Sequence, residues 1–245
     1  MGASTGIGKA LAIHYANKNT IIGLAARRID LLEEVASQCR LNKAKAYVFK
    51  VDVTDEENCS IAAHEFISLA GGIDIVIANS GIGSNDDILT GSSQKINKVL
   101  STNVLGVTNT VLPFLPTMKD QKNGSIVGIS SVASFIPLPG RGGYSSSKIA
   151  VRRLFDSWRP TLKEHGIKII TICPGFIDTP MTKRIRFKPF LKDVTTAANA
   201  FARAIEKGKK TYVYPWQMRW LVRLVKVIPQ GIIDLFIGNS KGYYK

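Results

Sequence analysis

The sequence predicts an α/β fold, a doubly wound parallel sheet in a single domain, because short apolar runs alternate with segments of helical spacing. Runs such as Ile73–Asn79 are apolar at almost every position, as in strands that helices cover on both faces. The hydrophobic fraction of 45% and the mean hydropathy of +0.06 are those of a folded globular chain rather than a disordered one.

Six apolar, β-rich runs are expected to form the strands: Thr20–Ala26, Ala44–Val51, Ile73–Asn79, Gly124–Ser130, Ile167–Cys173 and Thr211–Pro215. Helical spacing predicts the helices Lys9–Ala16, Asp30–Arg40, Asp55–Ala70, Ser93–Met118 and Tyr144–His165, and Pro160 is expected to bend the last one. In such sheets, ligands bind beyond the carboxyl ends of the strands, so the chemistry is expected there.

The stretch GASTGIG, residues 2–8, is a glycine-rich turn that leads directly into a predicted helix. Gly2, Gly6 and Gly8 let the backbone approach a phosphate closely, and the helix that follows offers unpaired N–H groups. The spacing G-x-x-x-G-x-G differs from the classical G-x-G-x-x-G, so a glycine turn without a ligand is the alternative.

The next predicted strand ends in Arg27 and Arg28. Two guanidinium groups suit the 2′-phosphate of NADP(H), whereas an acidic residue at this point would bind the ribose hydroxyl of NAD. The alternative is that both arginines are solvated charges at the start of a helix, for which Asp30 is the expected N-cap.

The stretch YSSSK places Tyr144 and Lys148 four residues apart, on one face of a helix. A phenol with a pKa near ~10 is a poor acid–base group at neutral pH, and a neighbouring ammonium is expected to lower that pKa. Tyr144 would then exchange a proton with a carbonyl or alcohol oxygen. A surface Tyr–Lys pair is the alternative.

The motifs GASTGIG, AARR, DVTD, ANSG, TNVLG, ISS, YSSSK and PGFIDT resemble, in their content and order, those of classical short-chain dehydrogenases/reductases over about Gly2–Thr182. The resemblance implies a Rossmann-type fold, an NAD(P) cofactor and catalytic roles for Asn103, Ser131, Tyr144 and Lys148. Ser131 would polarise the substrate oxygen, with Ser130 as the alternative. Lys148 would also bind the nicotinamide ribose, and Asn103 would support a proton-relay water or be a satisfied buried amide.

The resemblance also implies a set of cofactor contacts after successive strands: Gly2, Ser4, Thr5, Gly6, Ile7, Gly8, Arg27, Arg28, Asp52, Val53, Asn79, Gly81, Tyr144, Lys148, Pro174, Gly175, Ile177 and Thr179. Asp52 would lie near the adenine, and Thr179 would bond the carboxamide or a phosphate. Ser80 stands where the family has alanine. No metal site is expected, because the three cysteines lack metal-ligand spacing.

Met1 stands where the family has the end of its first strand, so residues 1–215 are expected to form a dinucleotide-binding domain without that strand. An upstream start codon is the favoured reason and a shortened product the alternative. Because the strand would lie in the middle of the sheet, we expect this chain to be less stable and to bind cofactor poorly.

The formal charge of +15 is concentrated near the end of the chain: residues 183–245 hold 14 Lys/Arg and 3 Asp/Glu, which leaves +11 there. Met181–Asp193 is expected to be a substrate loop, as a lid that favours acidic substrates or as a mobile surface loop. Residues 216–245 are expected to be a basic amphipathic extension, with a helix in Trp216–Gly238 that Pro229 and Gly231 interrupt. This helix would pack over the substrate cleft or a subunit partner, or lie on a membrane surface.

The favoured function is an NADP(H)-dependent oxidoreductase that interconverts an alcohol and a carbonyl on an apolar or lipid-like substrate. The alternative is a catalytically idle scaffold that binds a cofactor or a membrane; a nicotinamide-dependent epimerase or dehydratase is a lesser option. A homo-dimer or tetramer through Ser93–Met118 and Tyr144–His165 is expected, and nucleic acid is not. The scattered cysteines favour a reducing, cytoplasmic location, with peripheral contact at a membrane surface as the extension of that prediction.

Overall fold

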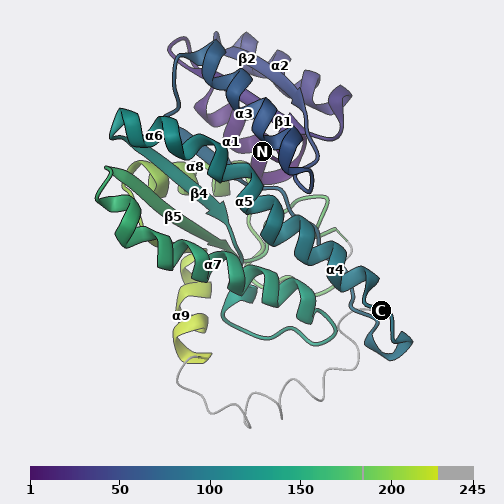
Figure 1. Ribbon diagram of the computed structural model, residues 1–245. Helices are drawn as coiled ribbons and strands as arrows, with labels where there is room; N and C mark the ends of the chain where they lie inside the picture. Colours follow the sequence, from purple (N-terminus) through teal and green to yellow (C-terminus); the bar gives the residue numbers. More distant parts are fainter. Residues whose placement is uncertain (184, 226–245) are drawn as a thin grey trace.

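The computed structural model describes residues 1–183 and 185–225, and it confirms the alternation of strands and helices (Figure 1). Every predicted strand is present with bounds within two residues of those expected. The strands are β1 (Ile21–Ala26), β2 (Lys45–Lys50), β3 (Ile75–Ala78), β4 (Gly124–Ile129), β5 (Ile167–Pro174) and β6 (Thr211–Tyr214). All their pairings are parallel, as expected for strands connected through helices.

The α-helices in the described ranges are α1 (Gly6–Tyr15), α2 (Ile29–Leu41), α3 (Glu56–Ala70), α4 (Gln94–Leu100), α5 (Gly106–Val111), α6 (Leu115–Gln121), α7 (Gly142–Lys163), α8 (Val194–Glu206) and α9 (Trp216–Val225). The helix predicted over Ser93–Met118 is interrupted by a π-helical turn at Ser101–Leu105 and a 3₁₀ turn at Leu112–Phe114. Pro113 and Pro116 stand at the start of the last two segments, where their missing N–H groups cost nothing.

One helix start differs from the expectation, and one helix is present where none is expected. The N-cap position of α2 is Arg28, not Asp30; Asp30 lies in the first helical turn, where its charge still favours the helix dipole. Helix α8 occupies a stretch to which the sequence analysis assigns no element, and the Asp193 carboxylate caps it by accepting from the Thr196 amide at 2.8 Å.

Helices cover both faces of the β3–β6 sheet. Phe66 of α3, Val107 of α5 and Phe155 of α7 belong to one core cluster, whereas Leu11 of α1 and Phe201 of α8 belong to another. Burial on both faces explains why the strand sequences are almost uniformly apolar. Within the described part of the chain, no helix has the length and apolar character that crossing a membrane requires.

The strands form two sheets, with the orders β1-β2 and β3-β4-β5-β6. Met1 and Gly2 bridge them: the Met1 amino group donates to the Ile77 carbonyl at 2.7 Å, and the Gly2 amide donates to the Ala25 carbonyl at 2.7 Å. Below this bridge, a cavity of about 510 Å³ lies between the facing edges of β1 and β3. The bridge holds the carboxyl ends of both sheets together, next to the candidate site.

Candidate active site

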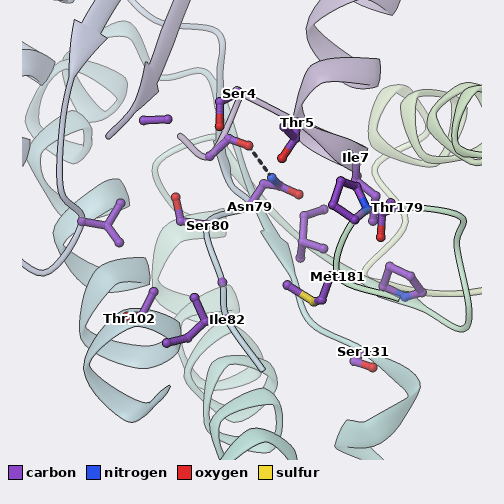
Figure 2. Close-up of a pocket in the computed structure, with 18 of the residues that line it drawn as sticks. Ser4, Thr5, Ile7, Asn79, Ser80, Ile82, Thr102, Ser131, Thr179 and Met181 are labelled. Atoms are coloured by element: carbon purple, nitrogen blue, oxygen red, sulfur yellow. Dashed lines mark hydrogen bonds between the residues drawn. The ribbon is translucent and has the colours of Figure 1, made fainter. Parts of the chain in front are cut away.

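The glycine turn packs so closely against its neighbours that side chains are excluded. Gly2 has φ +81°, and a Cβ atom there would lie 2.6 Å from the Ser80 amide nitrogen. A Cβ atom at Gly8 would lie 2.1 Å from the Gly2 carbonyl oxygen. The Asn79 side chain fixes the turn from the other side by donating to the Gly2 carbonyl at 2.8 Å (Figure 2). The turn is therefore a shaped backbone surface rather than a loose end.

A cavity of about 280 Å³ opens beside this turn, beyond the carboxyl ends of the strands (Figure 2). Its lining contains nearly every residue predicted for the site: Gly2, Ser4, Thr5, Gly6, Ile7, Arg27, Arg28, Asp52, Val53, Asn79, Gly81, Ser131, Tyr144, Lys148, Pro174, Gly175, Ile177 and Thr179. Gly8 and Asn103 are not among the lining residues, and Gly8 lines the cavity between β1 and β3 instead. Segments that are far apart in the sequence thus meet in one place, as the parallel topology requires.

The lining also contains residues that the motifs did not single out as contacts, among them Ser80, Ile82, Thr102, Pro180, Met181 and Thr182. Ser80 lies within the motif ANSG and Ile82 follows it, so this position beside predicted contacts is the signal that would have found them. Thr182 holds the loop after β5 in shape, because its hydroxyl donates to the Ile177 carbonyl at 2.6 Å. Thr102 belongs to the π-helical turn, which the sequence pattern does not reveal.

The two arginines after β1 have different surroundings. Arg28 donates to the Ser4 hydroxyl at 3.1 Å and to the Thr5 hydroxyl at 3.3 Å, so its guanidinium lies over the glycine turn. Arg27 lies 3.7 Å from the Asp52 carboxylate on the surface, where an ion pair contributes little. The Thr54 amide, more than Arg27, lowers the pKa of Asp52 by hydrogen bonding. Two cations therefore border one end of the cavity.

Ser130 and Ser131 have separate roles, which the sequence left open. Ser130 is buried, and its hydroxyl donates to the Lys148 carbonyl at 2.9 Å, which ties β4 to α7. Ser131 is only half-buried; its hydroxyl accepts from the Ala133 amide at 3.1 Å and interacts with Tyr144. This arrangement favours Ser131 as the serine that faces a substrate.

Tyr144 and Lys148 lie one turn apart on α7, with the Lys148 Nζ 5.7 Å from the centre of the Tyr144 ring. The Nζ atom donates to the Ile129 carbonyl at 2.9 Å. Burial lowers the pKa of Lys148 to about 8. Burial also raises the pKa of Tyr144, against the smaller opposing effects of Ser131 and Arg141. The net direction for Tyr144 is opposite to the one expected from the ammonium alone, because loss of hydration dominates.

Asn103 is fully buried in the π-helical turn, and its side-chain amide is satisfied by the protein. Its Oδ1 accepts from the Ile82 amide at 2.8 Å, and its Nδ2 donates to the Ile82 carbonyl at 2.9 Å and to the Ser147 hydroxyl at 3.0 Å. Asn103 thereby holds the loop after β3 against α7. This geometry is that of a satisfied buried amide, the alternative to a water-supporting role.

None of the three cysteines lines this cavity. Cys39, Cys59 and Cys173 are buried with free thiols. Among the described residues, no group of three or more His, Cys, Asp or Glu side chains is arranged to hold a metal ion.

Comparisons with known proteins agree with this geometry. Residues 1–189 match the family model described as short chain dehydrogenase. An uncharacterized oxidoreductase of Myxococcus xanthus is 30% identical over 95% of this chain and 92% of its own length. A protein of Arabidopsis thaliana named 11-beta-hydroxysteroid dehydrogenase-like 3 is 33% identical over 100% of this chain and 82% of its own.

Among solved structures, a short-chain type dehydrogenase/reductase from Mycobacterium marinum superposes with a TM-score of 0.79 at 27% identity, over 86% of this chain and 91% of its own. The TM-score shows that this solved structure and the chain share one fold. The chain therefore belongs to the short-chain dehydrogenase/reductase family, whose members are oxidoreductases that act on CH–OH groups and bind NAD(P).

Proposed function

We propose that this chain is an NADP(H)-dependent oxidoreductase that interconverts an alcohol and a carbonyl on an apolar substrate. The observation that carries the proposal is one cavity in which Ser131, Tyr144 and Lys148 meet the glycine turn and the arginines after β1. Ser131 supplies a hydrogen-bond donor, Tyr144 a proton donor and Lys148 a cation. The turn and the arginines supply a surface for phosphates.

The residues present fit a dinucleotide phosphate. The turn at Gly2 and Gly8 is a cradle that any Cβ atom would fill, and Thr5 does not use its side chain to cap α1, so the first N–H groups of that helix remain for a ligand. Arg28 is already held over the turn by Ser4 and Thr5. With Arg27 beside it, this end of the cavity favours the extra 2′-phosphate of NADP(H). A cofactor held by these residues would supply or accept the hydride of the reaction.

Tyr144 handles the proton. Since burial raises its pKa, the phenol is protonated at neutral pH and can give its proton to a carbonyl oxygen as that oxygen gains negative charge. The Ser131 hydroxyl donates a hydrogen bond to the same oxygen and so stabilises the developing charge. The Lys148 ammonium then favours the phenolate that remains on Tyr144. In the alcohol-to-carbonyl direction the same groups act in reverse.

The apolar character of the substrate is inferred from the lining. Ile82, Pro174, Pro180 and Met181 line the same cavity as Ser131 and Tyr144. Apolar walls with a few convergent polar groups favour a mainly apolar ligand with one oriented oxygen.

We also propose a homo-oligomer through α4–α6 and α7. Leu105, Leu112 and Ile149 are exposed on these segments, although side chains of this type are usually buried. Sedimentation of the purified chain tests this: a dimer or tetramer is expected, and a monomer at micromolar concentration would contradict it.

The experiment for the proposed function is a panel of apolar ketones and aldehydes, with oxidation of NADPH or NADH followed by absorbance. Turnover with NADPH that exceeds turnover with NADH is expected. Tight binding of NADPH without turnover of any compound would instead favour a scaffold that binds the cofactor without catalysis. Faster turnover with NADH would contradict the assignment of Arg27 and Arg28.

A further inference from the structure

Helix α9 has two faces of different chemistry. Its inward face carries Met218 and Val222, which are buried in a small cluster with Cys173 and Val213. Trp216, Trp220 and Leu224 follow one another at intervals of four, so they share one face of the helix. Their exposed fractions are 63%, 62% and 56%, so that face is directed to solvent. Large apolar side chains gathered in this way normally mark a binding surface.

Two arginines of α9 lie beside aromatic rings, one ring on this face and the other on β6. The Arg223 guanidinium lies 5.1 Å from the centre of the Trp220 ring, and the Arg219 guanidinium lies 5.7 Å from the centre of the Tyr212 ring. The helix sequence WQMRWLVRLV contains no acidic residue. We call Trp216, Arg219, Trp220, Arg223 and Leu224 the outer face of α9.

We propose that the outer face of α9 docks on the surface of an anionic lipid bilayer. Tryptophan rings favour the headgroup level of a membrane, and Leu224 would enter the acyl boundary beside them. Arg219 and Arg223 would meet anionic headgroups at the same depth. Because Met218 and Val222 anchor the inward face in the domain, the helix would lie flat on the bilayer rather than cross it.

Charge favours a bilayer over a second copy of this chain. A symmetric contact between two outer faces would bring Arg219 and Arg223 near their own copies, and α9 has no carboxylate to compensate them. The part of the predicted amphipathic extension beyond Val225 lies outside the described residues, and the proposal does not use it.

Docking would place the candidate active site near the bilayer. A Cβ atom at Gly175 would lie 2.9 Å from the Met218 Cγ, so α9 packs directly on a residue that lines the site cavity. An apolar substrate dissolved in lipid would then reach the cavity over a short path. This consequence rests on the proposed function, whereas the docking itself does not.

The test is flotation with vesicles of phosphatidylcholine alone or of phosphatidylcholine mixed with an equal part of phosphatidylserine, without cofactor or substrate. The chain is expected to float with the mixed vesicles and much less with the neutral ones. Arg219→Gln with Arg223→Gln should lower the affinity for mixed vesicles about 30-fold. This is the fold-change expected when two cations near an anionic surface are lost, each of which contributes about 1 kcal/mol to binding. Trp216→Ala with Trp220→Ala should lower it at least about tenfold.

The matched control is Leu41→Ala with Leu89→Ala, two leucines that are 81% and 99% exposed away from α9, and this variant should float like the parent chain. Circular dichroism melting of each variant separates lost binding from lost folding. Equal recovery of the parent with both vesicle types, or no flotation at all, would overturn the proposal. So would a change of sedimentation, without a change of flotation, in the tryptophan variant. Tyr144→Phe should float normally even if the proposed chemistry fails, so the two proposals fail separately.

Discussion

The cavity between β1 and β3 leads to a quantitative prediction about stability. Backbone groups of Ile21, Gly23 and Ala25 on β1, and of Ile75 and Ile77 on β3, point toward it, because their alternate neighbours bond to β2 and β4. Fusing a Val/Ile segment of about five residues before Met1 would fill it with a parallel strand, since β1 has six residues at ~3.3 Å each.

The magnitude follows from three contributions. About six new backbone hydrogen bonds stabilise by ~1 kcal/mol each, and burial of the apolar side chains adds ~10 kcal/mol. Ordering the segment opposes this by roughly 11 kcal/mol. The fusion also converts the buried Met1 ammonium, whose pKa burial lowers from 8.0 to about 6, into an amide, which removes about 1.4 kcal/mol of destabilisation at pH 7. The sum is a gain of about 6 kcal/mol, or a melting temperature higher by roughly 15 °C.

The assay is thermal melting by circular dichroism between pH 6 and 8, on chains whose first residue is checked by mass spectrometry. The unfolded chain binds more protons than the folded one in this window, so the stability of the parent should rise with pH by about 2 kcal/mol, while the fused chain should lose this contribution. A Gly/Ser segment of the same length is the control, since it removes the charge without filling the cavity. Equal melting of the Val/Ile and Gly/Ser fusions would refute the reasoning.

Three further predictions concern the site. Gly2→Ala should destabilise the fold by about 2–4 kcal/mol and abolish cofactor binding, because φ is +81° and the new Cβ atom would meet Ser80. The control Gly91→Ala, at φ +72° with nothing within 4 Å, should cost only ~1 kcal/mol in melting experiments. Equal losses in the two variants would contradict the close approach at Gly2. Arg28→Ala should weaken NADPH binding about 10- to 100-fold and NADH binding far less in fluorescence titrations, whereas Arg40→Ala, which breaks a surface ion pair with Glu33, should change neither. Carbonyl reduction should decline above a pH of about 8, where the Lys148 ammonium loses its proton; a rate that stays level to higher pH would show that this charge is not needed.

Much of the fold could be predicted because its signals are local. Each strand is a short apolar run, and the Tyr144–Lys148 pair needs only the helical repeat to share a face. The helix predicted over Ser93–Met118 is interrupted in the structure, although the spacing of its apolar residues is helical throughout. Pro113 and Pro116, near the starts of the 3₁₀ turn and of α6, mark the division. Helix α8 is not predicted, although its N-cap residue Asp193 is a sequence signal for a helix start.

Most residues predicted for the site line one cavity, but their hydrogen bonds and pKa shifts could not be predicted from the sequence. Ser130 and Ser131 are equivalent at the end of an apolar run. In the structure they differ in burial and in partners, since Ser130 donates to the Lys148 carbonyl and Ser131 interacts with Tyr144. Burial raises the pKa of Tyr144, and burial cannot be predicted from the spacing of two residues. The lowered pKa expected from the neighbouring ammonium is therefore wrong in direction. Asn103 lies in a π-helical turn, which the periodicity of the sequence does not predict.

The most direct test of the central claim compares Tyr144→Phe with the parent chain on the best ketone of the panel. The substitution removes one hydroxyl and keeps the ring, so NADPH affinity and melting temperature should remain near those of the parent. The rate of reduction should fall by at least about 10²-fold, the usual contribution of a positioned proton donor. Retained turnover in the Phe variant, with cofactor bound and the fold intact, would contradict the role assigned to Tyr144.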